Sequence, residues 1–237
     1  MPLKVWLPSI IVTGLAANAI YLLYRLRIPH KILHLVSSSA PPSSNFKLTS
    51  KKKSFHEVIF FPDRQYLCKY FVFSNGKHCG SESCTYSHSK DSSFFQLTKH
   101  LLKTQKTLDV CVYTICHELL ADIMIELQKQ RGVLVRIITD DEALTSSNCQ
   151  ICRLKTAGIE VRIDLTNTLM HHKFVLVDRK LLINGSFNWS FNGVTRNNDN
   201  VLITDEKELV NPYNNEFDKL WELFDPVNRS LLDSIKY

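Results

Sequence analysis

A histidine and a lysine two positions apart are the residues of this sequence best suited to chemistry on a phosphate. His171 and Lys173 lie in the segment MHHKFVLVD, whose apolar run predicts a strand over 170–177. Residues two apart in a strand share one face, so these two side chains should point together while His172 points to the other face. An imidazole beside an ammonium group is costly in a core. The pair is better placed against an anion, where Lys173 neutralises a phosphate oxygen and His171 attacks phosphorus.

Neutral hydrogen-bond donors follow at the end of the next predicted strand, 180–183. Gly185, in the segment NGSFN, lets the backbone approach a ligand closely. The Ser186 hydroxyl and the Asn188 amide can donate to the equatorial oxygens of a phosphate under attack. Donors placed where charge develops stabilise the transition state, as in an oxyanion hole.

These residues share the spacing H-x-K-x4-D-x6-G-S-x-N, in which Asp178 is the acidic member. The spacing resembles the HKD motif of the phospholipase D superfamily. The resemblance implies a phosphodiesterase in which a histidine forms a phosphohistidine, a second histidine protonates the leaving group, and no catalytic metal is needed. The chain has one copy of the motif, so the resemblance implies a homodimer that builds one active site from two motifs. His171 would then be the nucleophile in one subunit and the general acid in the other.

Two aspartates have roles that the residues alone leave open. The resemblance places Asp178 among the catalytic residues, but strand parity turns it away from His171. We therefore expect Asp178 to position neighbouring groups or the partner subunit. Members of the superfamily often have a glutamate further along that orients the histidine, and Asp199 stands at the matching place here, with a shorter side chain.

The motif predicts phosphodiester chemistry without choosing the phosphodiester. One hypothesis is a membrane phospholipid, for which the resemblance points to cardiolipin as substrate and phosphatidate as product. The other is single-stranded RNA, cut by an endoribonuclease that makes germline piRNAs. A lipid hydrolase needs an apolar channel beside the phosphate site and a nuclease needs a narrow basic cleft, and the sequence displays neither. A catalytically inactive membrane scaffold, or an RNA-binding module at mitochondria, is the alternative from another class, and the intact motif argues against it.

Three of the seven cysteines and one histidine follow a metal-binding pattern, C-x10-C-x4-C-x3-H. Three thiolates and one imidazole form a donor set for tetrahedral zinc. We therefore predict a structural zinc in a CCCH zinc finger at 66–90, where tyrosines among lysines would suit base stacking. The alternative is a hairpin with three buried cysteines and a surface histidine. The predicted ligands are Cys68, Cys79, Cys84 and His88.

The N-terminal part predicts a membrane anchor. After a short tail, 1–4, the segment 5–24 has no formal charge and is long enough to span one bilayer core. A basic linker rich in Ser and Pro follows at 25–54, which by the positive-inside rule leaves the main domain in the cytosol. This layout resembles single-pass signal anchors of the mitochondrial outer membrane. The net charge of +6 has its excess in the N-terminal half, which suits anionic lipid or nucleic acid, although a solvated linker would have the same composition.

Alternating apolar patterns predict an α/β domain over 55–237. We expect a mixed, largely parallel sheet flanked by helices, with functional residues at strand ends. The predicted strands are 55–61, 107–115, 133–139, 159–163, 170–177, 180–183 and 200–204, and the predicted helices are 93–105, 118–130, one within 140–156 and one within 206–224.

Overall fold

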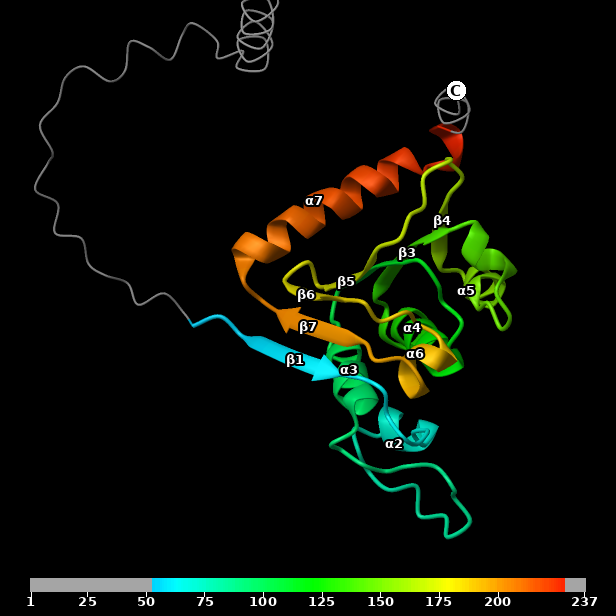
Figure 1. The fold of residues 1–237 in the computed structure, drawn as a ribbon, viewed down its shortest axis with the longest axis vertical. Coiled ribbons are helices and arrows are strands. Elements are labelled where there is room, and N and C mark those ends of the chain that lie inside the picture. The colour runs from blue at the N-terminus through cyan, green and yellow to red at the C-terminus, as the bar shows by residue number, and fades with distance from the viewer. Residues whose placement is uncertain (1–52, 229–237) are drawn as a thin grey trace, which may run out of the picture. The chain divides into compact units, whose positions relative to one another are not determined.

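A computed structural model describes residues 53–228 of the chain (Figure 1). The predicted anchor at 5–24 and nearly all of the linker at 25–54 lie outside the described residues. Within 53–228, no helix combines the length and the apolar character needed to cross a bilayer.

Seven strands form one sheet at the centre of the described domain: β1 (His56–Phe60), β2 (Thr107–Val112), β3 (Leu134–Asp140), β4 (Glu160–Asp164), β5 (Lys173–Val177), β6 (Leu181–Gly185) and β7 (Asn200–Thr204). Their order across the sheet is β1-β7-β6-β5-β2-β3-β4. Strands β2, β3 and β4 are parallel, and every other pair of neighbours is antiparallel. The mixed sheet is as predicted, but the expectation of a largely parallel sheet is wrong.

The antiparallel pairing of β5 with β6 follows from the short connection between them. Asp178 and Arg179 have φ angles of 52° and 57°, and the Lys180 amide donates to the Val177 carbonyl at 3.0 Å. Two successive residues with positive φ make a tight turn whose twist suits a hairpin. Since no helix fits in such a turn, β5 and β6 must be antiparallel, whereas helices connect the parallel strands β2, β3 and β4.

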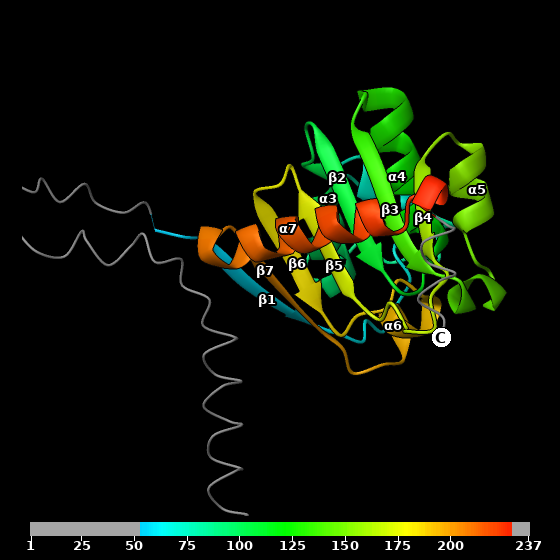
Figure 2. The same ribbon diagram turned by 90° about the horizontal axis from the view of Figure 1, so that it is seen from above.

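Helices cover both faces of the sheet (Figure 2): α2 (Lys69–Phe73), α3 (Ser93–Leu102), α4 (Glu118–Arg131), α5 (Ile151–Thr156), α6 (Phe191–Thr195) and α7 (Lys207–Leu223), with short 3-10 turns at Glu142–Thr145 and Pro226–Asn228. Side chains alternate along each strand. Val110 and Val112 of β2 therefore join the apolar cluster that contains α3 and α4, whereas Cys111 joins the cluster beneath α7. The predicted end of the helix starting at 118 is confirmed, because Gly132 caps α4 with a left-handed φ of 65°.

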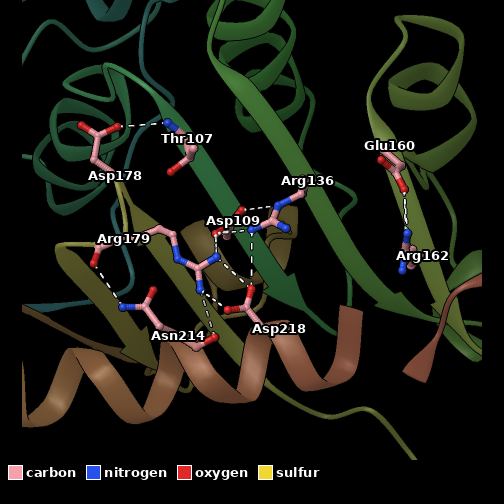
Figure 3. A network of polar contacts seen from close by, with 9 residues as sticks. All are labelled: Thr107, Asp109, Arg136, Glu160, Arg162, Asp178, Arg179, Asn214 and Asp218. Atoms are coloured by element: carbon pink, nitrogen blue, oxygen red, sulfur yellow. Dashed lines mark hydrogen bonds and ion pairs between the residues drawn. The ribbon is translucent and has the colours of Figure 1, made fainter. Parts of the chain in front are cut away.

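A charged network fastens α7 to the sheet (Figure 3). The Asp109 carboxylate on β2 is fully buried and accepts two hydrogen bonds from Arg136 on β3, at 2.8 and 2.9 Å. Arg179, from the β5–β6 turn, lies 3.6 Å from the same carboxylate and donates to Asp218 on α7 at 2.8 Å. The Arg136 guanidinium also lies 4.9 Å from the centre of the Phe217 ring. Groups from β2, β3 and the turn therefore fix the position of α7.

Candidate active site

The predicted phosphate-binding pair lies where β5 begins. The strand starts at Lys173, so the predicted strand 170–177 is wrong at its first three residues, and His171 lies in the segment before it. The Tyr113 amide of the segment after β2 donates to the His172 carbonyl at 2.9 Å, outside the regular ladder. Strand parity therefore does not explain how His171 and Lys173 come together.

Tyr113 is the residue that lies against both members of the pair. Its ring centroid is 5.0 Å from that of His171 and 5.5 Å from the Lys173 ammonium nitrogen, which also donates to the His171 carbonyl at 2.9 Å. Burial lowers the pKa of Lys173, and the Asp199 carboxylate opposes that shift. The sequence reasoning missed Tyr113, although it lies at the end of a predicted strand, where such sheets carry functional groups.

The loop with the neutral donors lies beside this pair because of the hairpin register. Continuing the β5–β6 pairing by one residue sets Gly185 opposite Lys173. A Cβ atom on Gly185 would lie 1.9 Å from the Asn200 carbonyl oxygen of β7, so the position has room for glycine alone. The Ser186 hydroxyl donates to the Asp199 carboxylate at 2.7 Å and accepts from the Asn200 amide at 3.1 Å. Ser186 and Asp199, both predicted site residues, are thus in direct contact.

Two buried acceptor atoms in this region have no hydrogen-bond partner within residues 53–228. They are the side-chain oxygen Oδ1 of Asn188 and the second carboxylate oxygen of Asp199. Such atoms are few in folded proteins. Within one chain, Asp199 contacts Ser186 and acts electrostatically on Lys173. Its orienting action on the histidine stays a prediction, as does the role of Asn188.

Asp178 lies away from the pair, at the other end of β5. Its carboxylate accepts hydrogen bonds from the backbone amides of Gln105, Lys106 and Thr107, at 2.7 to 3.1 Å (Figure 3 draws the bond to Thr107). These bonds tie the start of β2 to the β5–β6 turn. The described chain therefore does not bring Asp178 together with His171, and it gives Asp178 a positioning role in the fold.

The four predicted metal ligands converge. The donor atoms of the three cysteines and the histidine all lie within 4.8 Å of one another. His88 Nε2 is 3.2 Å from Cys79 Sγ and 3.9 Å from Cys84 Sγ. Donors bonded to one tetrahedral zinc are about 3.5 to 4 Å apart, so this arrangement fits such an ion. The remaining ligand, Cys68, directly precedes helix α2. The sequence did not predict α2, because its five residues are too few to show a helical period.

An aromatic surface lies between the cysteine-rich segment and α6. Leu67 and Ser87 form a parallel bridge, so the residues before them, Tyr66 and Tyr86, lie on neighbouring segments. Both tyrosines are exposed, and the Tyr66 ring centroid is 5.1 Å from that of exposed Phe191, the first residue of α6. We call Tyr66, Tyr86 and Phe191 the aromatic surface. Phe191, one member of this surface, follows Asn188 by three positions in the chain.

Known proteins resemble this chain over most of the described domain. A family model described as "Cardiolipin synthase, PLD-like domain" matches residues 97–221. The chain is 39% identical over 186 residues to a mitochondrial cardiolipin hydrolase of Danio rerio, covering 78% of this chain and 81% of that protein. It is 39% identical over 168 residues to one of Chlamydomonas reinhardtii, covering 71% and 74%. It is 33% identical over 181 residues to one of Homo sapiens, covering 75% and 71%.

Two solved structures share the fold. Nuc from Salmonella typhimurium, a phospholipase D family member, has a TM-score of 0.55 at 17% identity, over 72% of this chain and 95% of that one. NucT from Helicobacter pylori has a TM-score of 0.54 at 19% identity, over 72% and 97%. The motif, the fold and these relatives confirm the prediction from the sequence: the chain belongs to the phospholipase D superfamily and is a phosphodiester hydrolase.

Proposed function

We propose that the protein is a mitochondrial cardiolipin hydrolase that acts as a homodimer through a phosphohistidine on His171. The observation that carries the proposal is the gathering of His171, Lys173 and Ser186 at one end of the β5–β6 hairpin. The names of relatives that match more than two thirds of the chain support the substrate and the compartment. The predicted anchor at 5–24 would make the enzyme a single-pass protein of the outer membrane, with its catalytic domain in the cytosol.

The reaction has two displacements at phosphorus. In the first, an imidazole nitrogen of His171 attacks phosphorus, the bond to the leaving oxygen breaks, and the partner subunit's His171 gives that oxygen a proton. In the second, the same imidazole of the partner subunit takes a proton from water, whose oxygen attacks phosphorus while the phosphorus–nitrogen bond breaks. Cardiolipin would yield phosphatidate and phosphatidylglycerol. Lys173, Ser186 and Asn188 would stabilise the charge on the equatorial oxygens, without a catalytic metal.

The nucleophile is tested by turnover of cardiolipin in vesicles. His171→Asn removes the attacking nitrogen and should lower kcat by about a thousandfold or more. His56→Asn, which replaces an exposed histidine of β1 outside the site, is the matched control and should leave turnover unchanged. Full turnover by His171→Asn would contradict the mechanism.

The shared site is tested by mixing subunits. If each dimer uses His171 from both chains, dimers of one wild-type and one His171→Asn chain are inactive. Activity should then fall with the square of the wild-type fraction when the two chains are co-expressed. A linear decrease would show that each chain works alone and would refute the homodimeric site.

A second candidate function is endoribonuclease activity on single-stranded RNA, favoured by the aromatic surface. Exposed rings offer stacking platforms that every base can use, and Arg196 lies 5.7 Å from the Phe191 ring. Phe191 follows Ser186 by five positions in the chain, so we expect RNA bound at Ser186 to extend toward these rings. Turnover of RNA and of cardiolipin by one preparation separates the two functions. If RNA is the substrate, Tyr66→Ala and Phe191→Ala should weaken RNA binding by about tenfold each.

We also infer that the converging ligand set holds a structural zinc. Three sulfurs and one imidazole nitrogen are the donors of closed, four-coordinate zinc sites, which stabilise small folds and do not take part in reactions. Metal analysis of the purified chain should find one zinc per subunit. The alternative of an inactive scaffold or RNA-binding module would be supported by a folded, zinc-containing dimer that hydrolyses neither substrate.

A further inference from the structure

A cavity of about 450 Å³ opens beside the proposed nucleophile. One wall is the segment that leads from β4 to β5 and includes His171 and His172, and the other is the C-terminal half of α7. Its volume lies within the range of pockets that hold small molecules. We call it the α7 cavity. It is lined by Asp164, Thr166, Thr168, Leu169, Met170, His171, His172, Lys219, Leu220, Leu223 and Phe224.

The cavity is lined by five apolar side chains and by six polar or charged ones, among them the buried Asp164. Met170, Leu220 and Phe224 are buried and form its apolar base, while Leu169 and Leu223 are 49% and 36% exposed. Apolar side chains thus reach from the base of the cavity to its mouth, as in pockets that hold small molecules. The segment between β4 and β5 was expected to be a connection, so the sequence did not predict this wall.

The polar part of the lining that lies next to the chemistry comes from the two histidines. His171 itself lines the cavity, and His172, which also lines it, lies 3.9 Å from Glu216 of α7. Burial lowers the pKa of His172, and Glu216 opposes that shift. Lys219, also in the lining, donates to Glu216 at 3.1 Å, so the ammonium group of this lysine already has a carboxylate partner. A ligand in the cavity would therefore have its apolar part in the cavity and its phosphate at His171.

We propose that the α7 cavity binds one acyl chain of the phospholipid whose phosphodiester His171 attacks. The proposal rests on the proposed cardiolipin hydrolase function and adds to it the place of the substrate's apolar part. An acyl chain fits better than a nucleotide base, because the apolar side chains of the lining are aliphatic except Phe224, and the exposed stacking rings of the aromatic surface are not among them. Each methylene removed from water contributes about fourfold in affinity, so a few methylenes decide where the lipid binds.

The cavity is held in shape by the network that fastens α7. Arg136 contacts Phe217 and Asp218 of α7. The next two residues of the helix, Lys219 and Leu220, line the cavity. Contacts of Arg136 and Arg179 with Asp218, drawn in Figure 3, thus hold this part of α7 against the sheet. A preformed wall lowers the entropic cost of ordering an acyl chain against it.

The test locates the acyl chain directly. The full-length chain with His171→Asn is mixed with phosphatidylcholine vesicles that contain a cardiolipin carrying a photoreactive diazirine in one acyl chain. Irradiation should attach the label to peptides that contain residues 164–172 and 219–224. The double variant Leu169→Gln/Leu223→Gln, built in the same background, should lower labelling of these peptides by about tenfold, because it places polar amides at the mouth of the cavity. In the active chain it should lower kcat/KM for cardiolipin by a similar factor.

Leu209→Gln is the matched control, because Leu209 lies on the same helix, is 45% exposed and does not line the cavity. Labelling spread over other peptides, or equal kcat/KM for the double variant and for Leu209→Gln, would overturn the acyl-chain site while cardiolipin hydrolysis stands. If the wild-type chain cleaves single-stranded RNA and leaves cardiolipin vesicles intact, the cardiolipin function fails, and the acyl-chain site fails with it.

Discussion

Replacing the buried carboxylate under α7 should destabilise the protein far more than replacing an exposed partner of the same network. Asp109 is fully buried and receives two hydrogen bonds from Arg136 at 2.8 and 2.9 Å, with Arg179 at 3.6 Å. In Asp109→Asn, the side chain keeps its size but loses its charge and one acceptor. The two arginines would then be left with Asp218, which is 54% exposed, as their remaining acidic partner within the described network.

The magnitude follows from the geometry of the pair. Removing one partner of a buried ion pair costs about 3 to 5 kcal/mol, because the other charge stays buried and unpaired. Arg136 is 17% exposed, so water compensates little of this loss. We expect Asp109→Asn to lower the free energy of unfolding by about 3 kcal/mol. Total stabilities of domains are about 5 to 15 kcal/mol, so this change is large enough to measure by urea unfolding.

Asp218→Asn is the matched control, since it removes an equal charge at an exposed position of the same network. We expect a loss of about 1 kcal/mol or less there. Equal losses for the two variants would refute the claim that burial makes Asp109 important. Asp109→Leu combined with Arg136→Met should recover part of the loss, because an apolar pair leaves no unpaired charge between these two strands.

Three further predictions concern pH, space and metal. Burial lowers the pKa of His117 to about 4, so below pH 6.5 the unfolded chain binds a proton that the folded chain does not. Stability measured by urea unfolding should therefore fall by about 3 kcal/mol between pH 7 and pH 4, and His117→Gln should remove that part of the decrease. Gly185→Ala puts a Cβ 1.9 Å from the Asn200 carbonyl oxygen, so β6 and β7 must separate. Turnover should fall, and the free energy of unfolding should decrease by about 1 to 3 kcal/mol. Unchanged turnover and unfolding free energy would contradict this packing. If the proposed zinc is bound, a chelator, or Cys84→Ser, should lower the melting temperature by several degrees and remove the one zinc per subunit that we expect elemental analysis to detect.

Much of the fold could be predicted from the sequence, because the spacing of apolar residues and the residue types at helix ends are visible within a short segment. The helix starting at Glu118 ends at Gly132 as expected, and each predicted strand has a counterpart at nearly the same residues. The metal ligands could be predicted because spacing and residue type together define a zinc site. Their convergence in the structure agrees with that prediction, while the identity of the ion stays a prediction.

The remaining features depend on contacts between distant segments. Helix α6 connects β6 to β7 although these strands are antiparallel, so alternation of strands and helices does not by itself predict which pairs are parallel. Tyr113 contacts both His171 and Lys173, but it lies 58 positions before His171 in the chain. No pattern within the motif could therefore identify this contact. The α7 cavity combines a loop with a helix near the end of the described chain, and its apolar character appears only when the two are packed together.

The spacing of the motif itself becomes clear in the hairpin. Lys173 begins β5 and Asp178 follows its last residue, so the four residues between them are the rest of one strand. The next six residues make the turn and return along β6, which brings Gly185 back opposite Lys173. The motif therefore encodes two ends of one structural unit. At one end lie Lys173 and Ser186, where we propose that the phosphate binds. At the other end, Asp178 accepts hydrogen bonds from three backbone amides and fixes the turn that sets the register. An aspartate can thus belong to the motif without touching the reacting atoms of its own chain, because any slip in that register would carry Ser186 away from Lys173.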